Sequence, residues 1–279
     1  MKKTYFLALI LLAISSFGCQ KNITLDIPKY SSKVVVYCVL RPDSLPSMSL
    51  TLSQSYYSYA DTTGKPVYIA NAHVTIIDQN TNIVDTLNLD TVNNQFKFYF
   101  GKHRPIQGHH YIANINYQGK IITAQTTLPM AVKIDHIDYT KINSLPFTTD
   151  SSYVFALYFN DIPGETDNYT VTQASPFYYE ATDYYGFTSD AGQDGKQIEL
   201  FESLYHWDGV TPTAPFNVDF MVDNATKETA DYFSNLLSQS NSANNPFSQP
   251  VIVKGNINGG LGLFGAMTPS PSVTVKVVK

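Results

Sequence analysis

The sequence predicts a mainly β protein built from two β-sandwich-like units, with one short helix in the second unit. Short runs of alternating apolar and polar residues recur about every ten residues, and turn residues such as Gly, Pro, Asn and Asp separate them. This spacing is typical of an antiparallel sandwich rather than of βαβ units. Tyr and Phe, which favour strands, number 20 and 16. Only 15% of the residues are charged, which favours a packed body over disorder.

The first 18 residues have the features of a signal peptide. Lys2 and Lys3 make a short positive start, and residues 6–14 are apolar without interruption. Such a run is far too short to span a bilayer, for which about 20 residues are needed. We therefore expect residues 1–18 to be a signal peptide that directs the rest of the chain to the cell envelope.

The residues at the end of this segment resemble a lipobox, the motif of bacterial lipoproteins. A small residue, Gly18, directly precedes Cys19, whereas Ser16 stands where leucine is commoner and Phe17 is bulky. The resemblance implies cleavage between Gly18 and Cys19 and acyl chains on Cys19, which would hold the chain firmly at a membrane. Residues 19–32 then read as a tether. The alternative is an ordinary secretory signal followed by a chance cysteine.

Residues 33–129 are expected to form the first sandwich unit. Residues 47–53 alternate with a period of two, so that one face is apolar and the other carries hydroxyl groups. Cys38 lies inside the apolar run of residues 34–40, and we interpret it as a small buried hydrophobe rather than as a reactive thiol. Further strand-like runs cover residues 72–78, 83–89, 95–100, 111–117 and 120–128.

Residues 132–279 are expected to form the second, β-rich unit. Residues 153–159 and 168–174 read as two strands, and the turn residues between them suggest a hairpin with a long loop. Residues 175–195 read as a loop that is rich in tyrosine.

The C-terminal part of this unit contains the predicted helix. Apolar residues recur at helical spacing near residues 225–238, and Glu228 suits the first turn of a helix. Residues 251–258 and 272–278 are predicted as closing strands. The glycines at residues 259–265 indicate a close backbone approach or a bulged turn.

Charge and missing motifs argue against several classes of function. The formal charge is −5, and losing Lys2 and Lys3 with the signal makes the chain more acidic, which argues against nucleic acid as a partner. No H-E-x-x-H, C-x-x-C or G-x-S-x-G occurs, so no catalytic residue, metal ion or cofactor is expected. His109 and His110 would point to opposite faces of a strand, and we interpret them as exposed turn histidines.

Acidic residues leave one alternative open. Residues 190–195, Asp-Ala-Gly-Gln-Asp-Gly, lack the spacing of an EF-hand, so a polar turn is favoured over a weak calcium site. Asp135, Asp138 and Asp161 could supply paired carboxylates, but nothing in the sequence places them together.

Aromatic residues between the strands are the candidate ligand contacts. Loop aromatics can stack on sugar or peptide faces at low entropic cost. Packing of the same rings over the sandwich core is the alternative. The candidates are Tyr56, Tyr57, Tyr178, Tyr179, Tyr184, Tyr185 and Trp207.

A series of short motifs runs in order through nearly the whole chain after residue 18. The motifs are residues 19–23, 25–28, 33–36, 66–78, 87–98, 126–129 and 134–135, the run Phe-Asn-Asp-Ile-Pro-Gly-Glu at 159–165 with Asn168 and Tyr169, and residues 245–248, 256–257 and 259–265. Taken together, they resemble the lipoproteins of Bacteroidota that are grouped as domain of unknown function 4249, although Ile162 stands where a second proline is common in the central motif. The resemblance implies that the first unit is an immunoglobulin-like or carboxypeptidase-regulatory-like sandwich, and that the chain is an outer-membrane lipoprotein associated with a TonB-dependent receptor.

These observations lead to one favoured function and two alternatives. We expect a non-catalytic, lipid-anchored lipoprotein on either face of the outer membrane that binds a partner or a nutrient, beside a TonB-dependent receptor. The first alternative is a structural scaffold of the envelope or cell surface. The second is a secreted hydrolase, which would require acids or histidines clustered in a cleft.

Overall fold

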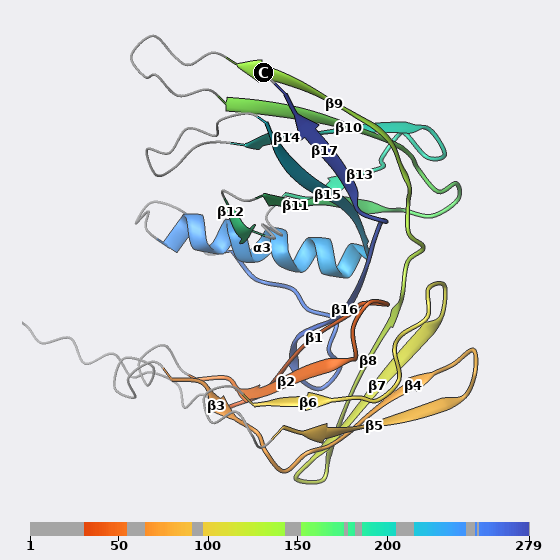
Figure 1. Ribbon diagram of the computed structural model, residues 1–279. Coiled ribbons are helices and arrows are strands. Elements are labelled where there is room, and N and C mark those ends of the chain that lie inside the picture. Colours follow the sequence, from red (N-terminus) through yellow and green to blue (C-terminus); the bar gives the residue numbers. More distant parts are fainter. Residues whose placement is uncertain are drawn as a thin grey trace, which may run out of the picture. The chain divides into compact units, whose positions relative to one another are not determined.

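Figure 1 shows the computed structural model of the chain, which describes residues 31–54, 65–90, 97–142, 152–175, 178–181, 186–204, 215–243, 249 and 251–278. Residues 32–279 form one compact unit. The predicted signal peptide, the lipidation site and nearly all of the tether therefore lie outside the described residues. No helix among the described residues is long and apolar enough to cross a bilayer.

The described chain is mainly β, with two sheets and a helix in its C-terminal part, which confirms the predicted fold class. The strands are β1 (Val34–Leu40), β2 (Ser47–Leu52), β3 (Val67–Tyr68), β4 (His73–Asp78), β5 (Ile83–Leu89), β6 (Phe98–Phe100), β7 (His110–Tyr117), β8 (Lys120–Thr127), β9 (Ile134–Ile142), β10 (Ser152–Asn160), β11 (Asn168–Ser175), β12 (Tyr178–Ala181), β13 (Thr188–Ser189), β14 (Gln197–Leu204), β15 (Phe216–Ala225), β16 (Leu261–Pro269) and β17 (Val273–Val277). The helix is α3 (Lys227–Ala243).

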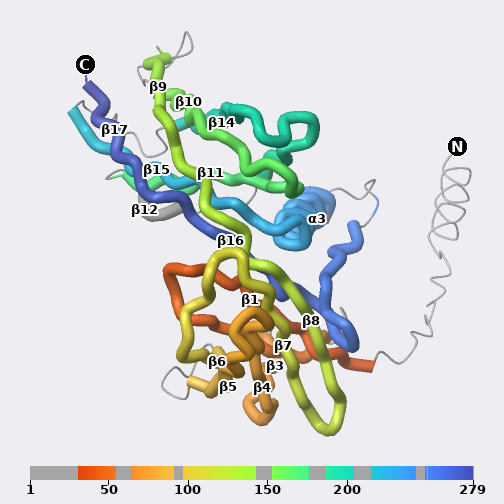
Figure 2. Tube along the Cα trace, turned by 90° about the vertical axis from the view of Figure 1, so that its right-hand side faces the viewer, coloured from red at the N-terminus to blue at the C-terminus, as the bar shows by residue number. Residues whose placement is uncertain are grey.

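The larger sheet runs through most of the described strands. Its order is β12-β11-β15-β16-β1-β2-β6-β5-β4-β7-β8, while β13, β17 and β3 pair with β11, β15 and β2. The smaller sheet has the order β14-β10-β9. Strand β16, which comes almost last in the chain, lies between β1 and β15 (Figures 1 and 2).

The glycines of residues 259–265 make the pairing of β1 with β16 possible. The two strands are parallel, and Val36 stands opposite Gly262. A Cβ on Gly262 would lie 2.0 Å from the carbonyl oxygen of Val36, and its φ of +103° is one that other residues rarely adopt. A Cβ on Gly255 would lie 1.8 Å from the carbonyl oxygen of Gly262. The predicted close backbone approach is confirmed, and it occurs in the middle of a sheet.

Two hydrophobic clusters fill the body. The first joins β1, β2, β4, β7 and β8 and includes Phe264 and Ala266 of β16. The second lies between the smaller sheet and strands β11, β15 and β17, where Phe155 packs on Phe220 and Phe159 on Tyr169, with ring centroids 4.7 and 4.8 Å apart. Strand β16 thus supplies buried residues to the first cluster although it belongs to the C-terminal part of the chain. The domain boundary expected between residues 129 and 132 stays a prediction.

Helix α3 rests on β16 through a buried hydroxyl group. Thr229 is fully buried, and its Oγ1 accepts a hydrogen bond of 3.1 Å from the backbone N–H of Ala266. A Cβ on Gly265 would lie 2.1 Å from this Oγ1, so that glycine is needed where the helix meets the strand. The helix occupies the predicted place but starts two residues later, because Ala225 is the last residue of β15, and it continues to Ala243.

Four expectations for local structure are wrong. Residues 175–195 are not a continuous loop, because β12 and β13 lie within them. Strands β10 and β11 do not form a hairpin, because β10 pairs with β9 and β14 while β11 pairs with β15 in the other sheet. Residues 251–258 form no strand beyond a single bridge between Asn258 and Thr123. The parallel pairing of β1 with β16 departs from a purely antiparallel arrangement. Alternation along one strand reports its two faces but not its neighbour, so it predicts strands better than pairings.

Candidate functional site

The aromatic residues and the lipidation site predicted from the sequence are not tested by the structure. Tyr56, Tyr57, Tyr184, Tyr185 and Trp207 lie outside the described residues, as do Gly18 and Cys19. The backbone of Tyr178 and Tyr179 belongs to β12, which pairs with β11, and their side chains are outside the description. Their role in ligand contact stays a prediction.

Cys38 is a core residue, as predicted. Its side chain is fully buried on β1, and burial raises the pKa of the thiol to about 12. A thiol with so high a pKa is hardly ionised near neutral pH and is a poor nucleophile.

Three aspartates that are distant in sequence converge where β10 ends. Asp161 follows β10, while Asp190 and Asp194 lie between β13 and β14. One carboxylate oxygen from each lies within 4.8 Å of the others, and Asp161 and Asp190 are buried. The structure thus adds Asp161 to the acidic turn that the sequence indicated. Asp135 is not one of the three, and it accepts a hydrogen bond from the side chain of Asn160, the residue before Asp161.

Backbone N–H groups donate to two of these three carboxylates. The N–H of Gly195 donates to Asp161 Oδ2 and the N–H of Gly164 donates to Asp194 Oδ1, each over 2.7 Å. Carboxylate oxygens are the ligands that Ca²⁺ prefers, so the three residues could hold a cation. The same hydrogen bonds also stabilise a polar turn without a cation, which is the interpretation that the sequence favours.

A buried polar network continues from Asp161 into the core. The hydroxyl group of Tyr169 lies 2.6 Å from Asp161 Oδ1 and 3.1 Å from Asp167 Oδ2, to which it can donate. Burial, followed by the hydrogen bond to Asp161, raises the pKa of Tyr169. Burial also raises the pKa of Asp167, against the lowering effect of a hydrogen bond from Asn224. Asn224 also donates to the carbonyl of Met130, so this network fastens β10 and β11 to β15 and to the chain after β8.

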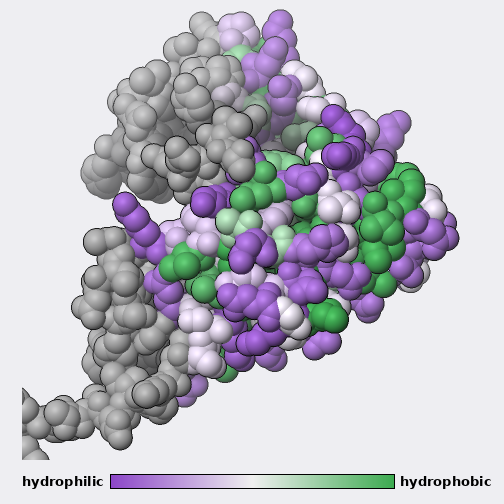
Figure 3. All heavy atoms as spheres, turned by 90° about the horizontal axis from the view of Figure 1, so that it is seen from below, coloured by the Kyte–Doolittle hydropathy of each residue, from purple (hydrophilic) through white to green (hydrophobic). Residues whose placement is uncertain are grey.

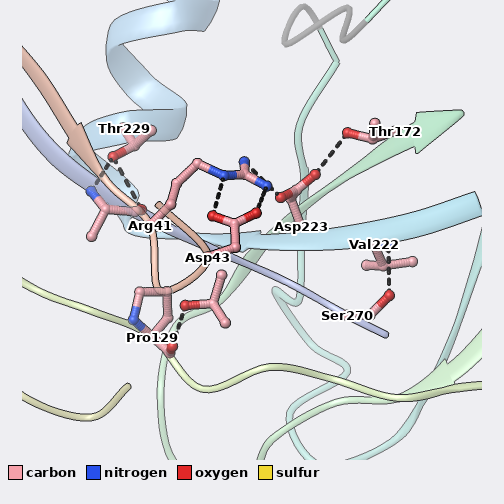
Figure 4. Close-up of polar contacts among 10 residues, drawn as sticks. Arg41, Asp43, Pro129, Thr172, Val222, Asp223, Thr229 and Ser270 are labelled. Atoms are coloured by element: carbon pink, nitrogen blue, oxygen red, sulfur yellow. Dashed lines mark hydrogen bonds and ion pairs between the residues drawn. The ribbon is translucent and has the colours of Figure 1, made fainter. Parts of the chain in front are cut away.

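A second buried polar group lies where β1 ends (Figure 4). The guanidinium of Arg41 lies between two carboxylates, 3.0 Å from Asp223 and 3.2 Å from Asp43. Asp223 is fully buried in β15 and also accepts a 2.7 Å hydrogen bond from the hydroxyl of Thr172. These contacts join β1, β11 and β15, and we assign this group to stability because the guanidinium and the buried carboxylate contact each other within the fold.

A cavity of about 290 Å³ opens beside the β4–β5 hairpin and the segment between β6 and β7. This volume is just below the usual range for ligand pockets, about 300–1,000 Å³. Six of the eleven residues that line the cavity are aliphatic or aromatic, namely Pro46, Ile76, Ile83, Pro105, Ile106 and Tyr111. Seen from below, the described surface has separate apolar areas within a largely hydrophilic surround (Figure 3).

Two buried aspartates in the wall of this cavity shape the segment around it. Asp85 Oδ2 accepts hydrogen bonds from the backbone N–H groups of Lys102 and His103, at 2.7 and 2.9 Å. Asp78 Oδ2 lies 2.8 Å from Nδ1 of His109, and Asp78 Oδ1 accepts the N–H groups of residues 80 and 81. Burial favours the neutral form of Asp78, but these bonds outweigh it and hold its pKa below the ordinary value of 3.8.

Sequence reasoning missed this cavity and misread one of its neighbours. His109 is half-buried against Asp78 rather than exposed in a turn, because the aspartate at the end of β4 needs a donor. Asp78 and Asp85 face inward from strands whose alternation is otherwise apolar. An acidic residue at a core position of a strand is the sequence signal that could have indicated this cavity.

The fold and these sites define a mainly β protein with a small cavity beside strands of its larger sheet and a cluster of three aspartates at the end of β10 in its smaller sheet. The chain belongs to the family described as domain of unknown function (DUF4249), whose model matches residues 20–271. No curated protein matches the chain. Among solved structures, the chain is similar to one titled as a cytokine receptor complex, crystal form 1A. The alignment has 11% identity and a TM-score of 0.25, and it covers 86% of this chain and 94% of the other.

Proposed function

We propose that this protein is a non-catalytic lipoprotein of a bacterial outer membrane that binds a partner or a nutrient, beside a TonB-dependent receptor. The observation that carries the proposal is Gly18-Cys19 directly after an apolar run of signal-peptide length. The chain belongs to the DUF4249 family, and the resemblance to that family implies the outer membrane and the TonB-dependent receptor.

Binding, rather than catalysis, is supported by the way the cavity uses its polar groups. Asp78 and Asp85 are occupied by backbone N–H groups and by histidine, so they act in folding the segments around the cavity. A general acid or base needs a proton position that faces the substrate. The apolar walls suit a ligand that is held without reaction.

The anchor is tested by labelling cells with a fatty acid and by mass spectrometry of the mature N-terminal peptide. We expect acyl chains on Cys19 in the natural chain and none in Cys19→Ala, which should be released from membranes. Cys38→Ala is the matched control, because it removes the buried thiol and should keep the label. An unmodified N-terminus, or a label lost only in Cys38→Ala, would contradict the proposal.

The partner is tested by cross-linking in intact outer membranes, followed by purification of the natural protein and of Cys19→Ala. We expect a TonB-dependent receptor to be enriched with the natural protein, and deletion of the gene to reduce uptake of that receptor's nutrient. The scaffold alternative expects neither result. Failure of both would therefore leave the anchor in place and overturn the binding role.

A further inference from the structure

The acidic and the basic side chains that line the cavity beside the β4–β5 hairpin differ in how far they are buried. Its wall contains two acids, Asp78 and Asp85, and two permanent cations, Lys102 and Arg104. The acids are buried and the cations are exposed, so that the cations lie at the mouth. The charge of a ligand that fits this cavity depends on which of these four side chains already has a hydrogen bond or ion pair within the protein.

Both acids are already engaged within the protein. Asp85 accepts two backbone N–H groups through Oδ2, and its Oδ1 lies 3.5 Å from Nδ1 of His103. Asp78 accepts two backbone N–H groups through Oδ1 and faces His109 through Oδ2. A cationic ligand would find few free acceptor sites on these carboxylates.

The two cations are not engaged by carboxylates. Within the described part of the chain, the side chain of Lys102 has no hydrogen bond or ion pair. Arg104 donates from Nη1 to the main-chain oxygen of Asp43, while the carboxylate of Asp43 is held by Arg41. Lys102 and Arg104 therefore keep donors that can receive an anion.

We propose that this cavity binds a small organic carboxylate, with its apolar body against Ile76, Ile83 and Ile106 and its carboxylate between Lys102 and Arg104 at the mouth. Arginine and lysine are the usual partners of carboxylates, and arginine can bind both oxygens at once. The volume of about 290 Å³ suits a body the size of one aromatic ring with a short chain. This inference deepens the proposed binding function by naming a ligand class.

The test is calorimetric titration of the acylated protein in lipid nanodiscs with 3-phenylpropionate, with empty nanodiscs subtracted as the blank. We expect saturable binding of one equivalent. The uncharged isostere 3-phenylpropionamide should bind between about twofold and thirtyfold more weakly, since two exposed ion pairs are lost. This comparison needs no mutation, so it does not depend on how well a variant folds.

The matched variants locate the site. Lys102→Gln combined with Arg104→Gln should weaken 3-phenylpropionate to the level of the amide, while binding of the amide stays the same. Lys133→Gln, which removes an exposed charge away from the cavity, should change neither. Equal binding of acid and amide, equal weakening by Lys133→Gln, or no binding of either compound would each overturn the proposal. If Cys19 is not acylated, the titration is run on the secreted chain, so failure of the anchor and of the cavity are told apart.

Discussion

Gly262 has a backbone conformation and a neighbour that both exclude a side chain. Its φ is +103°, and a Cβ would lie 2.0 Å from the carbonyl oxygen of Val36 in the adjacent strand. Gly119, in the turn between β7 and β8, shares the positive φ, at +77°, but has no atom within 4 Å of the same position. The pair therefore separates the cost of conformation from the cost of a clash.

We expect Gly262→Ala to destabilise the protein by about 3 kcal/mol or more, because strain and the collision with β1 add together. Gly119→Ala should cost only about 1 kcal/mol, which is the strain alone. Urea unfolding followed by tyrosine fluorescence measures both. Equal losses in the two variants would show that β16 does not press against β1 as closely as the structure has it.

Arg41 and Asp223 illustrate how a single ion pair joins distant elements. Asp223 is fully buried, and the Arg41 side chain is 21% exposed. Removing one member of such a pair leaves an uncompensated charge in the core, and this loss exceeds the net contribution of the pair. Asp43, by contrast, is 52% exposed on the other side of the guanidinium.

We expect Arg41→Met to lower the free energy of unfolding by about 3–5 kcal/mol. Asp43→Asn should lower it by about 1 kcal/mol or less, because water already screens that contact. Thermal and urea unfolding of the two variants provide the measurement. A loss for Asp43→Asn as large as that for Arg41→Met would mean that the exposed partner, and not Asp223, carries the interaction.

At the scale of elements, Asp78 links the end of β4 to the segment that precedes β7. Because its pKa in the folded protein lies below 3.8, its stabilising effect is complete above that pH. The effect is lost as the pH falls through the lowered native value, when the carboxylate takes up a proton.

Asp78→Asn should therefore destabilise the protein by about 1–3 kcal/mol at pH 7. The difference from the natural chain should shrink as the pH falls below 3.8. Urea midpoints measured from pH 2 to pH 7 test this, with the exposed Asp138→Asn as control. If the difference in urea midpoint between the natural chain and Asp78→Asn stays constant across this range, the ionised form of Asp78 does not stabilise the folded state.

The same elements show what a sequence can and cannot predict. The alternating runs give β2, β4, β5, β7 and β8 almost to the residue, because each has one face in the core. The partners of β10 and β11 could not be predicted, since the two strands belong to different sheets and their aromatic residues Phe159 and Tyr169 meet between those sheets.

The sites were predicted less well than the strands. The sequence singled out the segment that contains Asp190 and Asp194 and favoured a polar turn there, whereas Asp161 reaches these residues only through the path of β10 and β14. The cavity depends on Asp85 meeting the backbone of residues 102 and 103, which are distant in the sequence, and its only local sign is an acidic residue at a core position of β5. The aromatic residues proposed from the sequence stay predictions, because only the backbone of Tyr178 and Tyr179 is described and the other five lie outside the described residues.

At the scale of the whole molecule, β16 holds together parts that are far apart in the chain. It pairs with β1 on one side and β15 on the other, supplies Phe264 and Ala266 to the first cluster and supports α3. Native-state hydrogen exchange should therefore show the amides of Leu263 to Met267 exchanging only with global unfolding. Exchange of these amides by a smaller opening, while β7 and β8 stay protected, would contradict a single cooperative body.

The position of β16 also affects when the larger sheet can form during synthesis of the chain. The edge of β1 is among the first parts of the body to leave the ribosome, yet its partner lies at Leu261–Pro269. Until that late segment emerges, the nascent chain lacks the strand that joins β1 to β15 in the larger sheet. The larger sheet can therefore be completed only after residues 261–269 have been synthesised, so the order of the strands delays the last step of folding.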